Sequence, residues 1–184
     1  MNKIIILFIL FSTTVSYSQL FEGQKFCEES KNESYFPLLI GKKKIFWKKG
    51  FYFETKGETK IINGKTYTEF KQVWNNSDLD SDLLYFREEN GVVYQYEKCC
   101  QMETIRFDPK FKNGHSWKDA KKDAAYTIIT YDGKLKTPYC EYQNLLVIEA
   151  KYTNVTFNFY YLRGHGYIGA TQDNQLISCI SPEW

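Results

Sequence analysis

The sequence predicts an all-β fold: a single antiparallel sheet of about 8 to 11 strands, strongly curved or forming a barrel-like meander. Aromatic residues make up 18% of the chain, and such side chains favour the pleated, half-buried surface of a sheet. Asn-Gly or Asp-Gly occurs at 63–64, 90–91, 113–114 and 132–133, and these pairs tolerate the positive φ angles of hairpin turns. No segment has apolar residues at helical spacing over three turns.

Residues 1–19, MNKIIILFILFSTTVSYSQ, have the layout of a secretory signal peptide. A positive charge at Lys3 precedes an apolar run from Ile4 to Phe11, and small and polar residues follow. The run is much shorter than the roughly 20 residues of a membrane-spanning helix. We therefore expect an exported protein, periplasmic or secreted, that does not span the membrane. Cleavage near Gln19 would leave a single β-rich domain at residues 20–184.

The strand-like runs follow one another along the rest of the chain. The first is KIFWKKGFYFE, at residues 44–54. Two hairpins come next, TKIINGKTYTEF and LLYFREENGVVYQYE, and the later runs are CCQMETIRF, AAYTIITY, NLLVIEAKY, VTFNFYYL, YIGAT and QLISCI. Alternation is clear at 156–161, where Phe157 and Phe159 alternate with polar neighbours. Residues 118–125, KDAKKDAA, are expected to form a short helix or an irregular loop.

The charge balance argues against a nucleic-acid partner. The chain has 24 basic and 22 acidic residues, whereas nucleic-acid-binding proteins have a strong basic excess. Lysines are concentrated in GKKKIFWKKG, at residues 41–50. They could contact an acidic lipid headgroup or another polyanion. We favour an edge strand whose lysines prevent one sheet from pairing with another.

The chain has five cysteines, Cys27, Cys99, Cys100, Cys140 and Cys179. In an exported protein cysteines form disulfides, so two bridges and one free thiol are the simplest expectation. A bridge between the neighbours Cys99 and Cys100 would close a strained ring, and adjacent residues on a strand point to opposite faces. We therefore expect one of these two to bridge Cys27, Cys140 or Cys179. The sequence does not identify which of the three is its partner.

The segment NNSDLDSDLLYFREE has the sharpest polar pattern. Asp78, Asp80 and Asp82 alternate, and Glu89 is the twelfth residue from Asp78, as in a calcium-binding loop. Leu83 occupies the sixth position, where such a loop has Gly. We expect an ordinary solvated loop, and neither a metal nor any other cofactor.

Two further patterns have structural interpretations. His115 and His165 lack the short paired spacing of zinc ligands. In RGHGYIG, Gly164 and Gly166 precede a strand-like run, whereas a phosphate-binding loop precedes a helix. This stretch therefore predicts a turn or a β-bulge.

Four stretches, in order, resemble a family of uncharacterised secreted proteins and lipoproteins of bacterial envelopes. The family's Pro-Leu-x-x-Gly-x-x-Trp stretch corresponds to FPLLIGKKKIFW, with Pro37, Leu38 and Gly41 in place. Its Gly-x-x-Trp corresponds to 114–117, its Thr-Pro-x-Gly-x-Phe-x-Asn to TPYCEYQN, and its Tyr-x-x-Gly-x-Gly to 161–166. Cys140 stands at the glycine position of the third stretch. The resemblance implies a β-rich, barrel-type domain with no assigned activity.

Three functions remain open from the sequence. The first is a non-enzymatic exported β-domain that binds a small or apolar ligand or an envelope component. Its candidate binding residues are Trp47, Trp117, Tyr161 and His165, and aromatic side chains commonly line concave sites. The second is a periplasmic interaction protein, of immunity or inhibitor type, that docks on a partner protein. The third is a hydrolase that uses a Cys-His pair or carboxylates.

We favour the first function, because no catalytic constellation stands out in the sequence. The three hypotheses predict different structural features. An aromatic-lined interior cavity would favour ligand binding. An exposed apolar patch would favour docking on a partner, and titrating groups clustered in a cleft would favour a hydrolase.

Overall fold

The computed structural model describes residues 25–30, 33–75 and 81–182, which form twelve β-strands and no helix. The all-β prediction is confirmed. The strands are β1 (Lys42–Trp47), β2 (Gly50–Ile62), β3 (Lys65–Trp74), β4 (Ser81–Glu89), β5 (Val92–Glu97), β6 (Met102–Phe107), β7 (Ser116–Lys118), β8 (Ala125–Lys136), β9 (Glu141–Lys151), β10 (Thr156–Leu162), β11 (Gly166–Gln172) and β12 (Gln175–Ser181). Across this described part, no helix is long and apolar enough to cross a membrane. The expected signal peptide lies outside the described residues.

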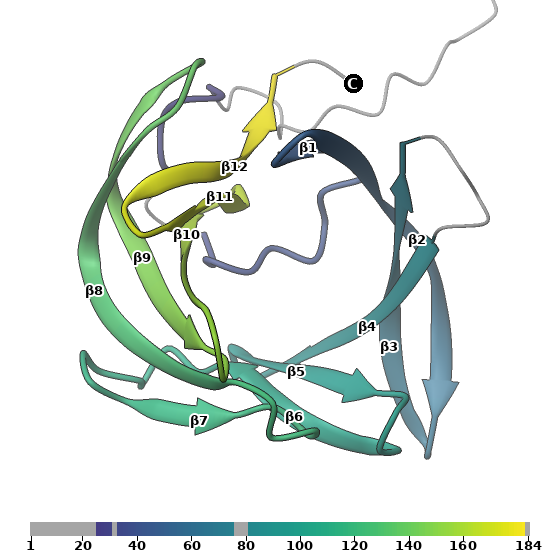
Figure 1. The fold of residues 1–184 in the computed structure, drawn as a ribbon. Helices are drawn as coiled ribbons and strands as arrows, with labels where there is room; N and C mark the ends of the chain where they lie inside the picture. Colours follow the sequence, from purple (N-terminus) through teal and green to yellow (C-terminus); the bar gives the residue numbers. More distant parts are fainter. Residues whose placement is uncertain (1–24, 31–32, 76–80, 183–184) are drawn as a thin grey trace, which may run out of the picture.

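The twelve strands form one antiparallel sheet in which strands that follow each other in the chain are paired, except β6 and β7. β1 to β6 make one half and β7 to β12 the other, and pairing of β1 with β12 joins the halves. β6 and β7 remain as the two edges, and we call the gap between them the seam. Figure 1 shows the sheet curled around a central space, with β6 and β7 on the same side. The sheet is therefore strongly curved but not closed.

Two of the predicted hairpin turns lie where the sequence places them. Asn63-Gly64 and Asn90-Gly91 have positive φ angles and connect β2 to β3 and β4 to β5. Asp132-Gly133 does not form a turn, because it lies within β8 at a shift in the β8–β9 register. Val147 and the Leu145 carbonyl pack so closely against Gly133 that a Cβ would collide with them. Here glycine allows a bulge in a bent strand rather than a reversal of the chain.

The lysine-rich run does not form an edge strand, so that prediction is wrong. β1 lies between β2 and β12. Its side chains alternate between faces, with Lys43 and Ile45 buried on the concave side. On the outer face, the Nζ atom of Lys42 lies 4.4 Å from the ring centroid of Phe53, and Lys44 lies over neighbouring rings. The run therefore places one ammonium group in the interior.

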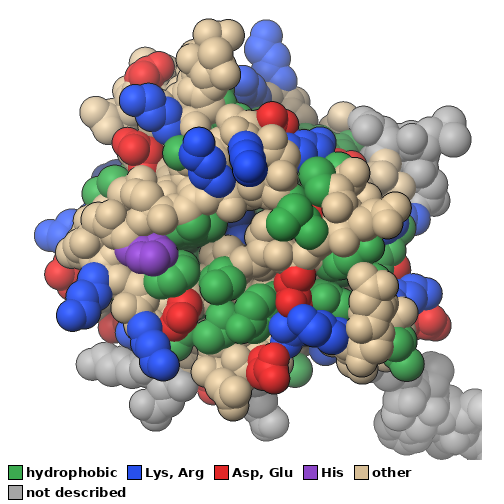
Figure 2. Space-filling model, turned by 90° about the horizontal axis from the view of Figure 1, so that it is seen from below, with side chains coloured by type: hydrophobic (Ala, Val, Ile, Leu, Met, Phe, Trp, Pro, Cys, Tyr) green, Lys and Arg blue, Asp and Glu red, His purple; other side chains and the backbone are tan. Residues whose placement is uncertain are grey.

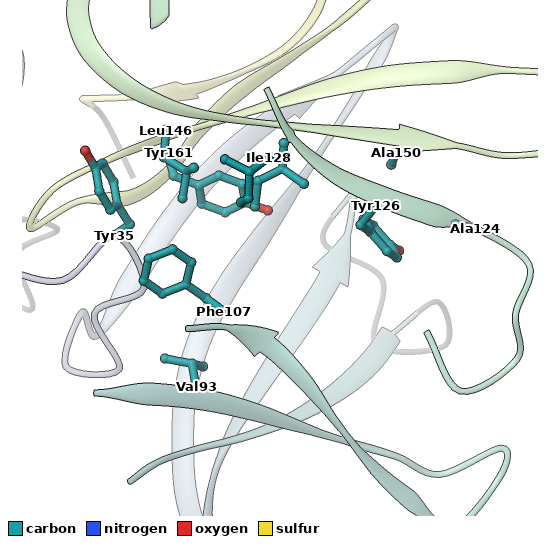
Figure 3. Close-up of a cluster of buried hydrophobic side chains, with 10 residues drawn as sticks. Tyr35, Val93, Phe107, Ala124, Tyr126, Ile128, Leu146, Ala150 and Tyr161 are labelled. Carbon is teal, nitrogen blue, oxygen red and sulfur yellow. The ribbon is translucent and has the colours of Figure 1, made fainter. Parts of the chain in front are cut away.

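A cluster of buried side chains connects the two halves of the sheet across the seam. It combines Val93 and Phe107 from β5 and β6 with Tyr126, Ile128, Leu146, Ile148, Ala150 and Tyr161 from β8 to β10. In Figure 3 the rings of Tyr35 and Phe107 lie between these halves, with centroids 6.1 Å apart. Tyr35 belongs to the segment before β1, which crosses the space inside the sheet (Figure 1).

The described cysteines form two bridges and leave one free thiol. Cys27 pairs with Cys140, and Cys99 pairs with its neighbour Cys100. Cys179 is buried and free. The expectation that Cys99 or Cys100 reaches a distant cysteine is wrong, because both residues lie in the turn between β5 and β6. The alternation of strand side chains does not apply in a turn.

Two other expectations concerned the connections between strands. Within the expected range 118–125, residues 119–124 form an irregular loop between β7 and β8, which is the second of the two expected alternatives. Gly164, in the turn between β10 and β11, and Gly166, the first residue of β11, have positive φ angles, and the β10–β11 register shifts between Tyr160 and Tyr161. The prediction of a turn or a bulge in RGHGYIG is therefore confirmed.

Candidate functional site

The concave side of the sheet contains a cavity of about 190 Å³, which we call the inner cavity. Its wall includes six aromatic rings, Trp47, Tyr52, Phe70, Phe86, Phe159 and Tyr167, from β1 to β4, β10 and β11. The segment 36–40, which precedes β1, supplies another part of the wall. Strand alternation explains the arrangement, because every second side chain of each strand points to the concave face.

A row of polar side chains crosses the wall of the inner cavity. Lys43 of β1 is opposite Glu54 of β2 in the strand register, and Glu54 is opposite Gln72 of β3. The Nε2 atom of Gln72 donates a hydrogen bond to Oε2 of Glu54 at 2.8 Å. All three residues line the cavity. They lie on the same face of adjacent strands, so the register brings them together.

Lys43 is only 7% exposed, yet no described carboxylate lies within ion-pair distance of its Nζ atom. Burial lowers the pKa of Lys43 below its ordinary value, although the nearby charge of Glu54 acts in the opposite direction. A buried ammonium group is costly unless its charge is compensated. The inner cavity therefore has an incompletely compensated positive charge in its wall.

Arg106 brings a second cation to the same cavity from β6. Its Nη2 atom donates a hydrogen bond to the hydroxyl oxygen of Tyr161 at 3.1 Å. Its guanidinium carbon lies 5.4 Å from the ring centroid of Tyr126, across the seam. Within the described chain, no carboxylate forms an ion pair with Arg106. A guanidinium group remains charged under all ordinary conditions.

A second cavity, of about 390 Å³, lies at the seam, and we call it the outer cavity. Residues of β4 to β6 line one side, and Trp117, Tyr126 and the loop after β7 line the other. Leu84, Phe86 and Arg106 line both cavities, so the cavities adjoin at these side chains. Figure 2 views the molecule from the side of β6 and β7, where hydrophobic side chains gather at the centre of the face among charged ones.

The two cavities differ in charge. The charged residues of the inner cavity are Lys43, Arg106 and Glu54, two cations and one carboxylate. The outer cavity has Arg106 and Lys121 with three carboxylates, Glu97, Asp119 and Asp123. Burial raises the pKa of Glu97, while nearby Arg106 acts to lower it. The outer cavity therefore has an excess of acidic side chains and the inner cavity an excess of basic ones.

The sequence identified some of the residues around the cavities and missed others. Trp47 and Tyr161 line the inner cavity, and Trp117 lines the outer one. His165 lines neither, because it is buried in the turn between β10 and β11. Arg106 was not among the candidate binding residues, and Lys43 was considered only as one of the lysines of the run at 41–50. The sequence feature that could have identified them is a basic residue at a position of a strand where the alternation of side chains predicts an inward direction.

The calcium pattern is only partly described. Asp78 and Asp80 lie outside the described residues, whereas Asp82 and Glu89 lie near opposite ends of β4. They are seven positions apart along the strand, which is about 23 Å at roughly 3.3 Å per residue. They cannot bind one ion together. Where the chain is described, no group of three His, Cys, Asp or Glu side chains is placed to hold a metal.

An ion-pair cluster on β3, β4 and β6 lies apart from the cavity residues. Glu103 accepts hydrogen bonds from Arg87, from Lys65 at 2.7 Å and from the Tyr67 hydroxyl at 2.9 Å. Burial acts to raise the pKa of Glu103, but these donors outweigh it and hold the pKa at about 2. The charges of this cluster are mutually compensated, in contrast to the cations of the inner cavity.

His165 predicts a loss of stability in mild acid. Burial lowers its pKa from the ordinary 6.5 to about 4, and the side chain is 2% exposed. Between these values the unfolded chain binds a proton at His165 and the folded protein does not. Stability should therefore fall as the pH falls, by about 2 kcal/mol between pH 7 and pH 5.

Urea unfolding of the wild type and of His165→Gln at both pH values would measure this contribution. The variant should lose less stability between pH 7 and pH 5, by about the same 2 kcal/mol. Glu97, whose pKa is raised, acts in the opposite direction in both proteins, so it cancels from the comparison. Glu103 titrates below this window because its pKa is about 2. An equal pH dependence in the two proteins would contradict the prediction.

A comparison with known proteins found no matching family model, no matching curated protein and no matching solved structure.

Proposed function

We propose that the protein is a non-enzymatic, exported β-domain that binds a small, partly apolar ligand inside the curled sheet. The observation that carries this proposal is the inner cavity of about 190 Å³, lined by aromatic rings and adjoining a second cavity at the seam. Protein interiors are ordinarily packed with few voids larger than a water molecule. A concave, largely apolar site with a few convergent polar groups is typical of small-molecule binding.

The Cys27–Cys140 disulfide supports export to an oxidising compartment, periplasmic or outside the cell. The resemblance to secreted proteins of bacterial envelopes, which rests on the four sequence stretches, is consistent with the same proposal. Pro37 and Leu38 of the first stretch and Tyr161 of the fourth line the inner cavity. Trp117 of the second lines the outer one. On this proposal, these stretches form part of the binding site.

Docking on a partner protein is the second candidate function. Met102 and Ile105 are 47% and 39% exposed on β6, which is an edge of the sheet. An unpaired edge with apolar side chains can accept an additional strand from a partner. Ile105 also lines the outer cavity. The ligand-binding proposal therefore offers another explanation for the exposed apolar side chains of β6, as part of a route to the cavities.

A hydrolase is the third candidate, and one feature of the outer cavity favours it. Glu97 and Asp119 both line this cavity, and the charge of Asp119 contributes to the raised pKa of Glu97. A carboxyl group with a raised pKa beside a second carboxylate is a common acid–base arrangement. Among the described lining residues, no serine, cysteine or histidine accompanies them. Ligand binding accounts for both cavities and is the simpler interpretation.

The neutral fluorophore N-phenyl-1-naphthylamine tests the binding proposal, because its emission rises in an apolar site. We expect saturable binding with one molecule per chain. Leu84→Trp adds bulk where the two cavities adjoin and should weaken binding by at least about tenfold, equivalent to roughly 1.4 kcal/mol. Leu176→Trp makes the same change at an exposed position of β12 and should have little effect. Equal affinities in the two folded variants would refute binding in these cavities.

A further inference from the structure

The charges in the wall of the inner cavity are not balanced. Lys43 and Arg106 supply two positive charges, and Glu54 supplies one negative charge. Tyrosine and glutamine supply the other polar contacts, through Tyr161 on Arg106 and Gln72 on Glu54. With both cations and the carboxylate charged, the wall carries one net positive charge.

This imbalance is energetically costly in the protein alone. Lys43 is buried and has no ion pair with a described residue. Arg106 lines both cavities, and the nearby charge of Glu97 in the outer cavity compensates it only in part, without an ion pair. Buried charges in proteins are ordinarily paired. An anion in the inner cavity would compensate the extra charge, and in a water-poor site the attraction would be stronger than at the surface.

Arg106 and Tyr161 provide suitable geometry for direct contact with a carboxylate. A guanidinium group has five N–H donors in a rigid plane, and one Arg106 hydrogen bond goes to the oxygen of Tyr161. The remaining donors can bind a carboxylate through two parallel hydrogen bonds. The Tyr161 hydroxyl oxygen accepts from Arg106, so its own hydrogen is available to donate to the same anion.

The apolar rings determine what the rest of the ligand must be. Trp47, Phe70, Phe86, Phe159 and Tyr167 surround the same cavity as the two cations. A small inorganic anion would leave the space between these rings empty. An uncharged hydrocarbon would fill that space but leave the positive charge uncompensated. A molecule with one anionic group and an apolar body satisfies both parts of the wall.

We infer that the ligand is an amphiphilic monoanion, such as an organic carboxylate, whose anionic group contacts Arg106 and Tyr161 within the positive field of Lys43. This inference rests on the proposed function and names the class of ligand that the inner cavity takes. The acidic outer cavity is a region to pass through rather than the site of the anion, since its three carboxylates outnumber its two cations.

Titration calorimetry with three probes of equal chain length tests the inference. Decanoate is anionic, 1-decanol is neutral and decyltrimethylammonium is cationic. We expect decanoate to bind at least about tenfold more tightly than decanol, because hydrogen bonds to charged groups are the stronger ones. We expect the cationic probe to bind least.

Three substitutions identify the groups that hold the anion. Arg106→Met and Lys43→Met should each remove most of the preference for decanoate over decanol and leave decanol binding nearly unchanged. Tyr161→Phe deletes only the hydroxyl group and should reduce the preference severalfold. Lys44→Met is the matched control, because Lys44 is adjacent to Lys43 but lies on the outer face over aromatic rings. This control should keep the full preference.

The possible outcomes separate this inference from the proposed function. Equal binding of decanoate and decanol, unaffected by the three substitutions, would overturn the inference and leave apolar binding intact. Preference for the cationic probe would also overturn it and would move the site to the acidic outer cavity. If neither these probes nor N-phenyl-1-naphthylamine bind, both proposals are wrong. If Arg106→Met fails to fold, Lys43→Met and Tyr161→Phe still decide the inference.

Discussion

Removing the Cys27–Cys140 disulfide is expected to lower the free energy of unfolding by about 4 to 5 kcal/mol. The bridge joins residues 113 positions apart, and a crosslink that closes so long a loop strongly restricts the unfolded chain. The test is the double variant Cys27→Ser with Cys140→Ser, which leaves no new unpaired thiol. Its melting temperature should fall by about 10 °C or more, on the usual scaling for chains of this size.

The second bridge provides the control for this experiment. Cys99 and Cys100 are neighbours, so their bond restricts almost none of the unfolded chain. The double variant Cys99→Ser with Cys100→Ser should therefore change stability by less than about 1 kcal/mol. Mass mapping of the non-reduced wild type should find the two bridges of the structure. A crosslink from Cys99 or Cys100 to Cys179, or equal destabilisation in the two double variants, would contradict this account.

The long-range bridge also affects the proposed binding site. It anchors the segment before β1, in which Ser30 N and Ser34 O form hydrogen bonds with Arg163 O and Gly164 N in the turn after β10. Residues 36–38 of the same segment form part of the inner cavity wall. Loss of the disulfide should therefore weaken binding of N-phenyl-1-naphthylamine as well as lower stability. The Cys99 and Cys100 double variant should bind it normally.

The sequence predicted the features of the fold that depend on residues close together in the chain. Asn63-Gly64 and Asn90-Gly91 form turns because Asn and Gly tolerate positive φ. Asp173-Asn174 forms a similar connection, with φ angles of 50° and 62°, but it lacks glycine and was not recognised. β7 has three residues, which is too few to show alternation.

Features that depend on distant residues were not predictable in the same way. Nothing in the sequence of β6 or β7 indicates that these strands are the edges of the sheet. The Cys27–Cys140 pairing depends on a Cα–Cα distance of 5.6 Å, which only the folded chain establishes. The Asp132-Gly133 pair was wrongly predicted to form a hairpin turn, because glycine is favoured in β-bulges as well as in turns.

The candidate site falls between these cases. Alternation with Ile45 and Trp47 places Lys43 on the same face of β1, so its inward direction follows from the sequence once that face is known to be concave. Its position opposite Glu54 and near the cavity rings depends on strand pairing. The contact of Arg106 with Tyr161 joins β6 to β10 across the seam. The sequence could therefore predict aromatic rings in an interior, but not the unbalanced charge among them.

Gly169→Ala is expected to destabilise the protein by about 3 kcal/mol, the upper part of the usual range for overpacking. A Cβ at this position would lie 2.5 Å from the Ser178 carbonyl oxygen and 3.3 Å from the Cys179 Cα. Both are backbone atoms of β12, so they cannot move aside as a flexible side chain does. The methyl group would push β11 away from β12, next to the β1–β12 pairing that joins the halves of the sheet.

Gly57→Ala is the matched control, because its Cβ would approach mainly the Glu69 side chain, whose Oε1 atom lies 3.0 Å away. That carboxylate can rotate aside, and replacing glycine by alanine in a strand reduces the freedom of the unfolded chain. The control should therefore change stability by less than about 1 kcal/mol. Urea unfolding of both variants measures the difference, and equal stabilities would show that β11 and β12 can separate without cost.

The same substitution tests whether the pairing of β11 with β12 contributes to ligand binding. Tyr167 of β11 donates a hydrogen bond from its hydroxyl group to Ser178 Oγ at 2.7 Å, and its ring lines the inner cavity. A displacement of β11 from β12 would move this ring while leaving Lys43 and Arg106 on their own strands. Folded Gly169→Ala should therefore bind decanoate and decanol more weakly by a similar factor and keep its preference for the anion. A selective loss of decanoate binding would instead show that β11 helps to hold the charged groups in place.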